Sequence, residues 1–268
     1  VFNPITDTAQ GVFLNTNAGT SFFFAGTMNL STGANNAFTA MNGGSIDATG
    51  ANSSITTTTG VGLMIDGVDI RNTNFTISSL SSNGAPSGVI LNNTGVAGGL
   101  VVAGDGSNAR NGSGGTIQNT TGDGVLLADT NNVSLRSMNI INAGNSSDSS
   151  AGGNNLATND HAIQSERGGS ISLSGVLISN PAAGGWEAVD LGGTNRIDNN
   201  SRIEGVNISN MQALEVRNTN TNMPSFAINN SEFANQATTN GSSYDIFSSF
   251  GTSNMTVTFV LGGSGTKS

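Results

Sequence analysis

The sequence predicts an all-β protein, a single right-handed parallel β-helix (solenoid) of about nine coils. Three observations predict this fold. A triplet of an apolar residue, any residue and Asn recurs at steps of 23 to 38 residues, and runs of the type Gly-apolar-x-apolar recur upstream of the triplets. Apolar and polar residues also alternate with period two in short runs bounded by Gly, Asn, Asp and Ser, as strands do. An antiparallel sandwich or barrel stays open, because short strands alone do not fix how they pair.

The Asn of each triplet is expected at a tight turn. Successive Asn residues are separated by 23, 38, 30 and 25 residues, about one coil in each case. Asn tolerates left-handed backbone, and its side chain can bond to the neighbouring coil. We therefore expect a structural Asn ladder along one corner of the stack, formed by Asn119, Asn142, Asn180, Asn210 and Asn235.

The Gly-apolar runs give the length of a coil. From Val12 to Leu63 the step is 51 residues, about two coils, and from Leu63 to Val89 it is 26. The two steps that lead on to Ile163 stretch to 36 and 38 residues. The extra residues fall in two glycine- and serine-rich stretches, which we expect to be loop insertions, near residues 104–115 and 143–158.

The chain is expected to form one domain over residues 1–261, followed by a flexible tail at 262–268, because no composition break or charged run divides it. Open coil ends present unpaired edge strands, which usually require covering. We expect these ends to dock on other copies of the chain, or to continue into flanking segments of a longer chain. The expected assembly edges are Val1, Phe2, Asn3 and Ile5 at one end, and Met255, Val257 and Phe259 in the last strand.

Composition excludes several classes of function. The chain has no cysteine, so disulfides, zinc-thiolate sites and thiol nucleophiles are excluded. Charged residues make up only 9% of the chain, and the net charge is −9, which argues against nucleic acid and anionic lipid as partners. No apolar run approaches the length that a membrane-spanning helix needs, so no membrane span is expected.

A family resemblance rests on the stretch 114–127, GGTIQNTTGDGVLL, and its continuation through Asn132-Val133-Ser134-Leu135 to Met138-Asn139-Ile140. Residues 53–60 and 87–95 fit the same pattern. The chain resembles, over about residues 10 to 235, the parallel β-helix repeats of giant bacterial cell-surface proteins, which are described as adhesin-like. The resemblance implies an exported, extracellular protein at the cell surface, and it brings no catalytic residues. At 268 residues the chain is shorter than such arrays.

The best local set of candidate catalytic groups is acidic and surrounds the single histidine. It consists of Asp160, His161, Glu166, Glu187 and Asp190. Glu187 follows His161 by the length of one coil, so the two should stack. The paired aspartates and Gly-His-Gly of pectin-degrading β-helices do not occur. We therefore expect solvated side chains at coil edges, no enzymatic activity and no cofactor.

Calcium is the candidate metal, because several aspartates fall at turns. The run Gly104-Asp105-Gly106-Ser107-Asn108 begins like an EF-hand loop, but the glutamate expected at the twelfth position is missing. A calcium-binding array of stacked Gly-Gly-x-Gly-x-Asp turns is also absent from the sequence. No metal site is expected.

Two hypotheses for function follow. The preferred one is an extracellular structural and adhesive β-solenoid, a building block of a surface fibre or giant surface protein, joined end-to-end through open β-edges. The alternative is a β-helix that binds or acts on carbohydrate, with surface glycans as partners of the Asp160–Asp190 face.

Overall fold

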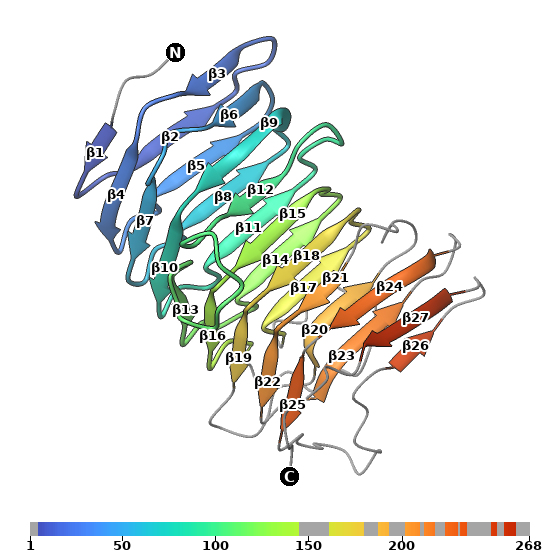
Figure 1. Cartoon of the computed structure of the whole chain (residues 1–268). Helices are drawn as coiled ribbons and strands as arrows, with labels where there is room; N and C mark the ends of the chain where they lie inside the picture. Colours follow the sequence, from blue (N-terminus) through green and yellow to red (C-terminus); the bar gives the residue numbers. More distant parts are fainter. Residues whose placement is uncertain are drawn as a thin grey trace.

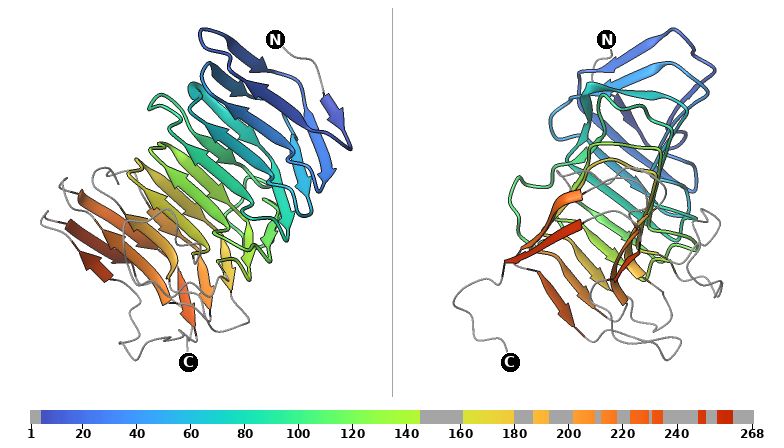
Figure 2. Two further views of the ribbon diagram at one scale, coloured as in Figure 1. Left: turned by 180° about the vertical axis from the view of Figure 1, so that it is seen from behind. Right: turned by 90° about the vertical axis from the view of Figure 1, so that its right-hand side faces the viewer.

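A computed structural model describes residues 5–144, 161–179, 187–192, 202–209, 212–217, 223–229, 231–234, 248–250 and 255–260. Over these residues the chain is all-β, with three nine-stranded sheets and no helix (Figure 1). The strands of each sheet lie side by side along the length of the stack, as the views from behind and from the side also show (Figure 2).

Each sheet takes every third strand of the chain. Sheet 1 contains β1 (Ile5–Asp7), β4 (Met28–Gly33), β7 (Ser54–Thr57), β10 (Ser79–Asn83), β13 (Thr116–Gln118), β16 (Asn139–Ile141), β19 (Leu177–Ser179), β22 (Asn207–Ser209) and β25 (Glu232–Ala234). Sheet 2 contains β2 (Val12–Asn15), β5 (Phe38–Met41), β8 (Leu63–Asp66), β11 (Val89–Asn92), β14 (Val125–Ala128), β17 (Ile163–Glu166), β20 (Glu187–Gly192), β23 (Gln212–Arg217) and β26 (Ser248–Phe250). Sheet 3 contains β3 (Ser21–Phe24), β6 (Ser45–Ala48), β9 (Asp69–Ile77), β12 (Leu100–Val102), β15 (Val133–Arg136), β18 (Ile171–Ser174), β21 (Arg202–Glu204), β24 (Met223–Asn229) and β27 (Met255–Val260).

The strand pairing confirms the parallel β-helix. The described chain visits sheets 1, 2 and 3 in turn, and each strand pairs in parallel with the strand one coil away, as β2 does with β5 and β5 with β8. Parallel pairing between successive coils contradicts the alternative of an antiparallel sandwich or barrel. Each coil in the described part of the chain has three strands, one in each sheet.

The register confirms the phase of the repeated runs. In sheet 2, Val12 pairs with Phe38 and Phe38 with Leu63, so Phe38 supplies the coil that lies between Val12 and Leu63. Leu63 pairs with Val89, one coil later. In sheet 1 the apolar residues of the triplets are aligned in the order Ile117, Ile140, Ile178, Ile208 and Phe233.

The core is a set of apolar columns between the three sheets. Inward residues such as Leu63, Val89 and Val125 are 0% exposed. Rings from two sheets meet edge-to-face near the N-terminal end, with centroids 5.4 Å apart for Phe24 and Phe38 and 4.8 Å apart for Phe38 and Phe75. Burying such a side chain contributes about 1.5–3 kcal/mol, and stacking repeats this contribution coil by coil.

The corner between sheets 2 and 3 turns through residues with left-handed backbone. Asn42, Asn93, Asp129 and Arg167 have φ of 60°, 49°, 47° and 51°. Their amides stay in the ladder between coils: Asn93 N donates to Ala128 O at 2.9 Å, and Asp129 N donates to Glu166 O at 2.9 Å. The chain therefore changes direction without losing these hydrogen bonds.

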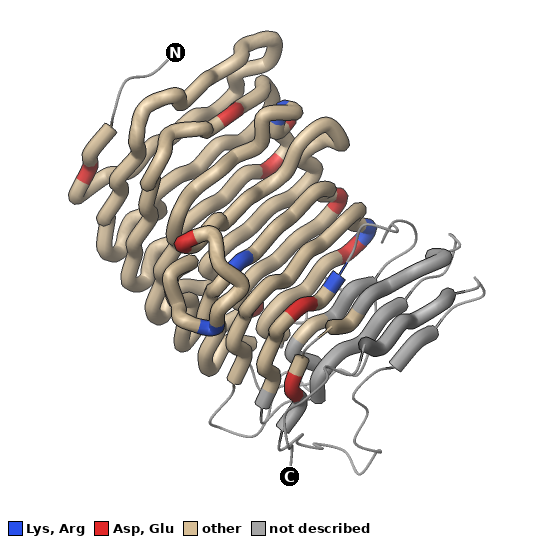
Figure 3. The backbone as a smooth tube through the Cα atoms, viewed as in Figure 1, with Lys and Arg blue, Asp and Glu red and all other residues tan. Residues whose placement is uncertain are grey.

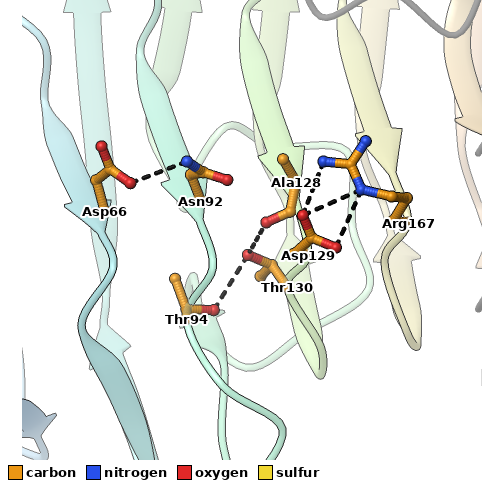
Figure 4. A network of polar contacts seen from close by, with 7 residues as sticks. All are labelled: Asp66, Asn92, Thr94, Ala128, Asp129, Thr130 and Arg167. Carbon is orange, nitrogen blue, oxygen red and sulfur yellow. Dashed lines mark hydrogen bonds and ion pairs between the residues drawn. The ribbon is translucent and has the colours of Figure 1, made fainter. Parts of the chain in front are cut away.

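Side chains tie the same corner together across coils (Figure 4). Arg167 contacts Asp129 through two nitrogens, Nη2 at 2.7 Å from Oδ2 and Nε at 3.1 Å from Oδ1. Thr94 Oγ1 donates to Thr130 Oγ1 at 3.1 Å, and Asn92 Nδ2 donates to Asp66 Oδ1 at 2.9 Å.

The insertion expected at 104–115 is a loop between β12 and β13, and it reaches over later coils. Arg136 Nη1 donates to Gly106 O at 2.7 Å, and Ser137 Oγ donates to Ser107 O at 3.1 Å. Arg110 Nη1 lies 3.1 Å from Glu232 Oε2 at the start of β25. The second expected insertion lies, from residue 145 on, outside the described residues, as does the expected tail at 262–268.

Candidate functional site

The N-terminal end of the stack is formed by β1, β2 and β3. Each of them is the last strand of its sheet and pairs on one side, with β4, β5 and β6 respectively. The opposite edge of each strand has no partner strand among the described residues. Such edges present rows of backbone N–H and C=O groups that can accept another strand.

The interior is also less covered at this end. Ile5, Val12 and Leu14 are only partly buried, although they pack against the core. Their register partners one coil further on, Met28, Phe38 and Ala40, are 1%, 0% and 0% exposed. A further layer on the N-terminal end would bury this row. Of the predicted edge residues here, Ile5 begins β1, whereas Val1, Phe2 and Asn3 lie outside the described residues.

The first corner of this end is held by Asp7. Its Oδ1 accepts the backbone N–H groups of Ala9, Gln10 and Gly11, each at 2.9 Å. These bonds, that from Gly11 foremost, lower the pKa of the Asp7 carboxyl below its usual value. The turn that leads into edge strand β2 is therefore shaped before any partner arrives.

The C-terminal end is formed by β25, β26 and β27, which close the opposite ends of the three sheets. The last strand predicted, Met255–Phe259, is present as β27, Met255–Val260, so Met255, Val257 and Phe259 all lie on a terminal strand. β27 pairs with β24, with a register shift between Met223 and Phe226. Its other edge has no partner strand among the residues that the structure describes.

Two members of the expected Asn ladder lie on described corners. Asn119 and Asn142 directly follow β13 and β16, with φ of 55° and 52°. Asn142 Nδ2 donates to Asn119 Oδ1 at 2.8 Å, and Asn119 Nδ2 donates to Asn83 Oδ1 at 2.8 Å. Asn83 lies outside the triplet pattern, because it pairs with Gln118 and not with Asn119, and Ser82 stands opposite Ile117 in place of an apolar residue.

The other three members, Asn180, Asn210 and Asn235, lie outside the described residues. The residues just before them belong to aligned strands: Ser179 pairs with Ser209, and Ser209 with Ala234. Over the described coils, the side-chain amides of Asn142 and Asn119 each bond to an amide of the neighbouring coil at this corner.

The acidic set around the histidine corrects one expectation. Asp160 lies outside the described residues, and Glu187 and Asp190 lie on β20, whose Asp190 is aligned with Gln164. His161 and Glu166 are 4% and 0% exposed, so the prediction of solvated side chains at coil edges is wrong for these two. The outward residues of sheet 2 are buried at this coil. A period-two pattern of apolar and polar residues in the sequence cannot show such burial.

His161 is held from the coil before it. Its backbone N–H donates to Asp123 Oδ1 at 2.9 Å, and its Nδ1 lies 3.5 Å from the same oxygen. The Asp123 side chain is 0% exposed and that of His161 5%. A substrate has no access to a pair this deeply buried, so the described members of the set do not favour carbohydrate chemistry at the Asp160–Asp190 face.

The calcium candidate at Asp105 is engaged by its own loop. Oδ1 accepts both the backbone N–H and the hydroxyl of Ser107, at 2.9 and 2.6 Å, and Oδ2 accepts Asn111 Nδ2 at 2.8 Å. These bonds, the Ser107 hydroxyl first, lower the pKa of Asp105 to about 2. Among the described residues, no group of three His, Cys, Asp or Glu is placed to hold a metal ion.

Sequence reasoning missed a pocket beside β9, the longest strand of the described chain. Its signal was the odd step between two inward residues, Ile70 and Phe75, both 0% exposed. Residues five apart cannot face the same side of a regular strand, so an odd step indicates a bulge.

Charged residues are sparse over the described part of the chain and do not gather into a basic patch (Figure 3). No helix among the described residues is long and apolar enough to cross a membrane. Comparison with known proteins finds no matching protein-family model, no matching curated protein and no matching solved structure.

Proposed function

We propose that this chain is an extracellular structural and adhesive β-solenoid, a building block of a surface fibre or giant surface protein that assembles end-to-end through its open β-edges. The observation that carries the proposal is the N-terminal end, where three edge strands accompany a partly buried apolar row. The resemblance to β-helix repeats of cell-surface proteins supports the extracellular location.

The chemistry of such a joint is strand addition in three sheets at once. A coil end placed on β1, β2 and β3 would satisfy their backbone groups and bury Ile5, Val12 and Leu14. The joint is head-to-tail, because the N-terminal end of one copy meets the C-terminal end of the next. Head-to-tail contacts that do not close into a ring produce open filaments. The proposal assigns no catalytic role to the chain.

Sedimentation and electron microscopy test the proposal. The mass that sedimentation reports should rise when the concentration of the purified chain is raised about a hundredfold. Electron micrographs should show filaments as wide as one coil. Leu14→Lys places a charge in the apolar row and should abolish assembly. Phe13→Lys is the matched control, because Phe13 lies on the same strand but points outward and is 65% exposed.

Both variants are first checked for retained β-structure by circular dichroism. A wild-type chain that stays monomeric at every concentration and shows no filaments contradicts the proposal. So does a Leu14→Lys variant that is folded and assembles as well as Phe13→Lys.

A further inference from the structure

A pocket of about 570 Å³ lies where two adjacent coils both carry extra residues beside sheet 3. In β9, Ile70 pairs with Ile46 and Phe75 with Ala48, so residues 71–74 bulge opposite Asp47 alone. In the next coil, residues 93–99 connect β11 to β12, where only residues 67–68 connect β8 to β9. Bulges often occur beside functional sites, because they redirect side chains.

The two insertions are bonded to each other. Ile70 N donates to Thr94 O at 2.8 Å, and Gly98 N donates to Ile70 O at 3.0 Å. Gly99 N donates to Asn74 Oδ1 at 3.1 Å. A side chain at Gly98 would collide with the carbonyl oxygen of Arg71, so the fit is close. The walls are therefore preformed, as in most small-molecule sites.

The positively charged side chain of Arg71 lines the pocket and contacts a carboxylate of the preceding coil. Arg71 Nη1 lies 3.3 Å from Asp47 Oδ2, and the two side chains are 47% and 4% exposed. The buried carboxylate fixes one end of the guanidinium, while the exposed remainder lines the pocket. Asp47 Oδ1 is buried and has no hydrogen-bond partner. Arg71 contacts this carboxylate through its other oxygen, Oδ2.

The other lining groups combine acceptors, donors and apolar surface. They are Ser45, Asp69, Ile70, Asn72, Gly95, Val96 and Ala97. Val96 is 72% exposed, an apolar side chain held out to solvent at the rim. A Cβ at Gly95 would lie 2.7 Å from Asp69 Oδ1, so this glycine keeps the carboxylate accessible.

We propose that this pocket binds a saccharide unit through vicinal hydroxyl groups. Each hydroxyl both donates and accepts, which matches an acceptor-only Asp69, a donor-only Arg71 and an Asn72 that does both. The exposed apolar side chain of Val96 suits the C–H face of a sugar ring. Among the lining groups Asp69 opposes an anion and Arg71 opposes a cation, and the net charge of −9 adds to the first effect, so the ligand is neutral. The proposal does not depend on end-to-end assembly.

A glycan array of neutral and acidic oligosaccharides identifies a ligand, and calorimetry with that oligosaccharide measures its affinity. Asp69→Ala removes an exposed acceptor, and Arg71→Lys keeps the charge near Asp47 but loses the planar fork. Each should weaken binding by about tenfold or more, as expected for hydrogen bonds to charged groups. Gly95→Ala should weaken it as well, by crowding Asp69. Arg202→Gln is the matched control, since Arg202 is exposed on sheet 3 outside the pocket.

Thermal unfolding shows which variants are folded, and only these are scored. Asp69→Ala is expected to fold, because the Asp69 side chain is exposed. This variant therefore decides the test even when the other variants unfold. The proposal is overturned when no neutral saccharide binds the wild-type chain, or when Asp69→Ala binds it as tightly as Arg202→Gln does. Preferential binding of acidic oligosaccharides or free glycine would also overturn it, in favour of a carboxylate or zwitterion as ligand.

Discussion

Gln164 is a buried polar residue whose chemistry fits its surroundings poorly. In the outward row of sheet 2, Ile90 pairs with Leu126 and Leu126 with Gln164. Gln164 is 0% exposed, and neither its amide nitrogen nor its amide oxygen has a hydrogen-bond partner. A buried unsatisfied amide costs about 1–3 kcal/mol, so an apolar residue would suit the site better.

Gln164→Leu should therefore raise the free energy of unfolding by about 1–3 kcal/mol, because it continues the apolar row and removes an unpaired amide. Urea denaturation monitored by circular dichroism measures the change. Gln10→Leu serves as the control at an exposed position and should leave stability nearly unchanged. A loss of stability in Gln164→Leu would show that the amide is satisfied after all.

Arg167 has an unusual backbone conformation that the structure accommodates. Its φ of 51° is rare outside Gly and Asn, and it stacks on Asp129, whose φ is 47°. Hydrogen bonding by Asp129 raises the pKa of Arg167. Both side chains are about a third or more exposed, so water screens the pair and its net contribution is small. The backbone ladder, in which Asp129 N bonds to Glu166 O, maintains the left-handed corner.

At the scale of elements, the loop at residues 103–115 works as a strap along the outside of the stack. It leaves sheet 3 after β12, contacts Arg136 and Ser137 one coil later, and reaches Glu232 at β25. A Cβ at Gly175 would lie 2.4 Å from Asn108 O, so the strap also packs closely against the coil that contains Gly175. The contacts of Asp105 with Ser107 and Asn111 hold the loop in this shape.

The strap should loosen only in strong acid. Because hydrogen bonds lower the pKa of Asp105 to about 2 from 3.8, their stabilisation is fully present above pH 3.8 and is lost as the pH falls through about 2. An NMR titration of the Asp105 carboxyl carbon measures this pKa. Asp105→Asn should speed amide exchange at Ser107 at neutral pH. A carboxyl that titrates near 3.8 would show that the loop does not bond to it.

At the scale of the whole molecule, the fold is a one-dimensional stack, in which each described coil contacts chiefly its neighbours. Leu63 pairs with Val89 one coil away, and both are 0% exposed within the same column. Stability in such an array is nearly a sum of coil and interface terms. Removing a whole coil should therefore leave the remaining interfaces intact.

Deleting one coil, from Leu63 to the residue before Val89, should keep the fold, because Val89 then takes the place of Leu63 beside Phe38. Circular dichroism should show retained β-structure and a cooperative melt. Deleting about half a coil should abolish folding, because it moves inward side chains out of phase. Equal behaviour of the two deletions would contradict the modular stack. The one-coil deletion also removes Asp69 and Arg71, so it should bind no saccharide.

Much of this architecture could be predicted from the sequence, because local periodicity determines the phase of a solenoid. A step of one coil length placed Leu63 on Val89, and the register agrees. The turn positions of Asn119 and Asn142 were visible for the same reason, since each ends a strand at a fixed distance from an inward residue. These features depend only on neighbours along the chain and on a constant coil length.

Burial of outward polar residues and the meeting of two insertions were decided by the tertiary structure alone. Gln164 and Glu166 alternate as solvated residues do, yet both are 0% exposed, because packing over a sheet face leaves no trace in period two. Arg71 and Val96 line one pocket although they lie about one coil apart in the chain. Such contacts form only when the coils stack. They therefore depend on how the coils are placed relative to one another and not on neighbours along the chain.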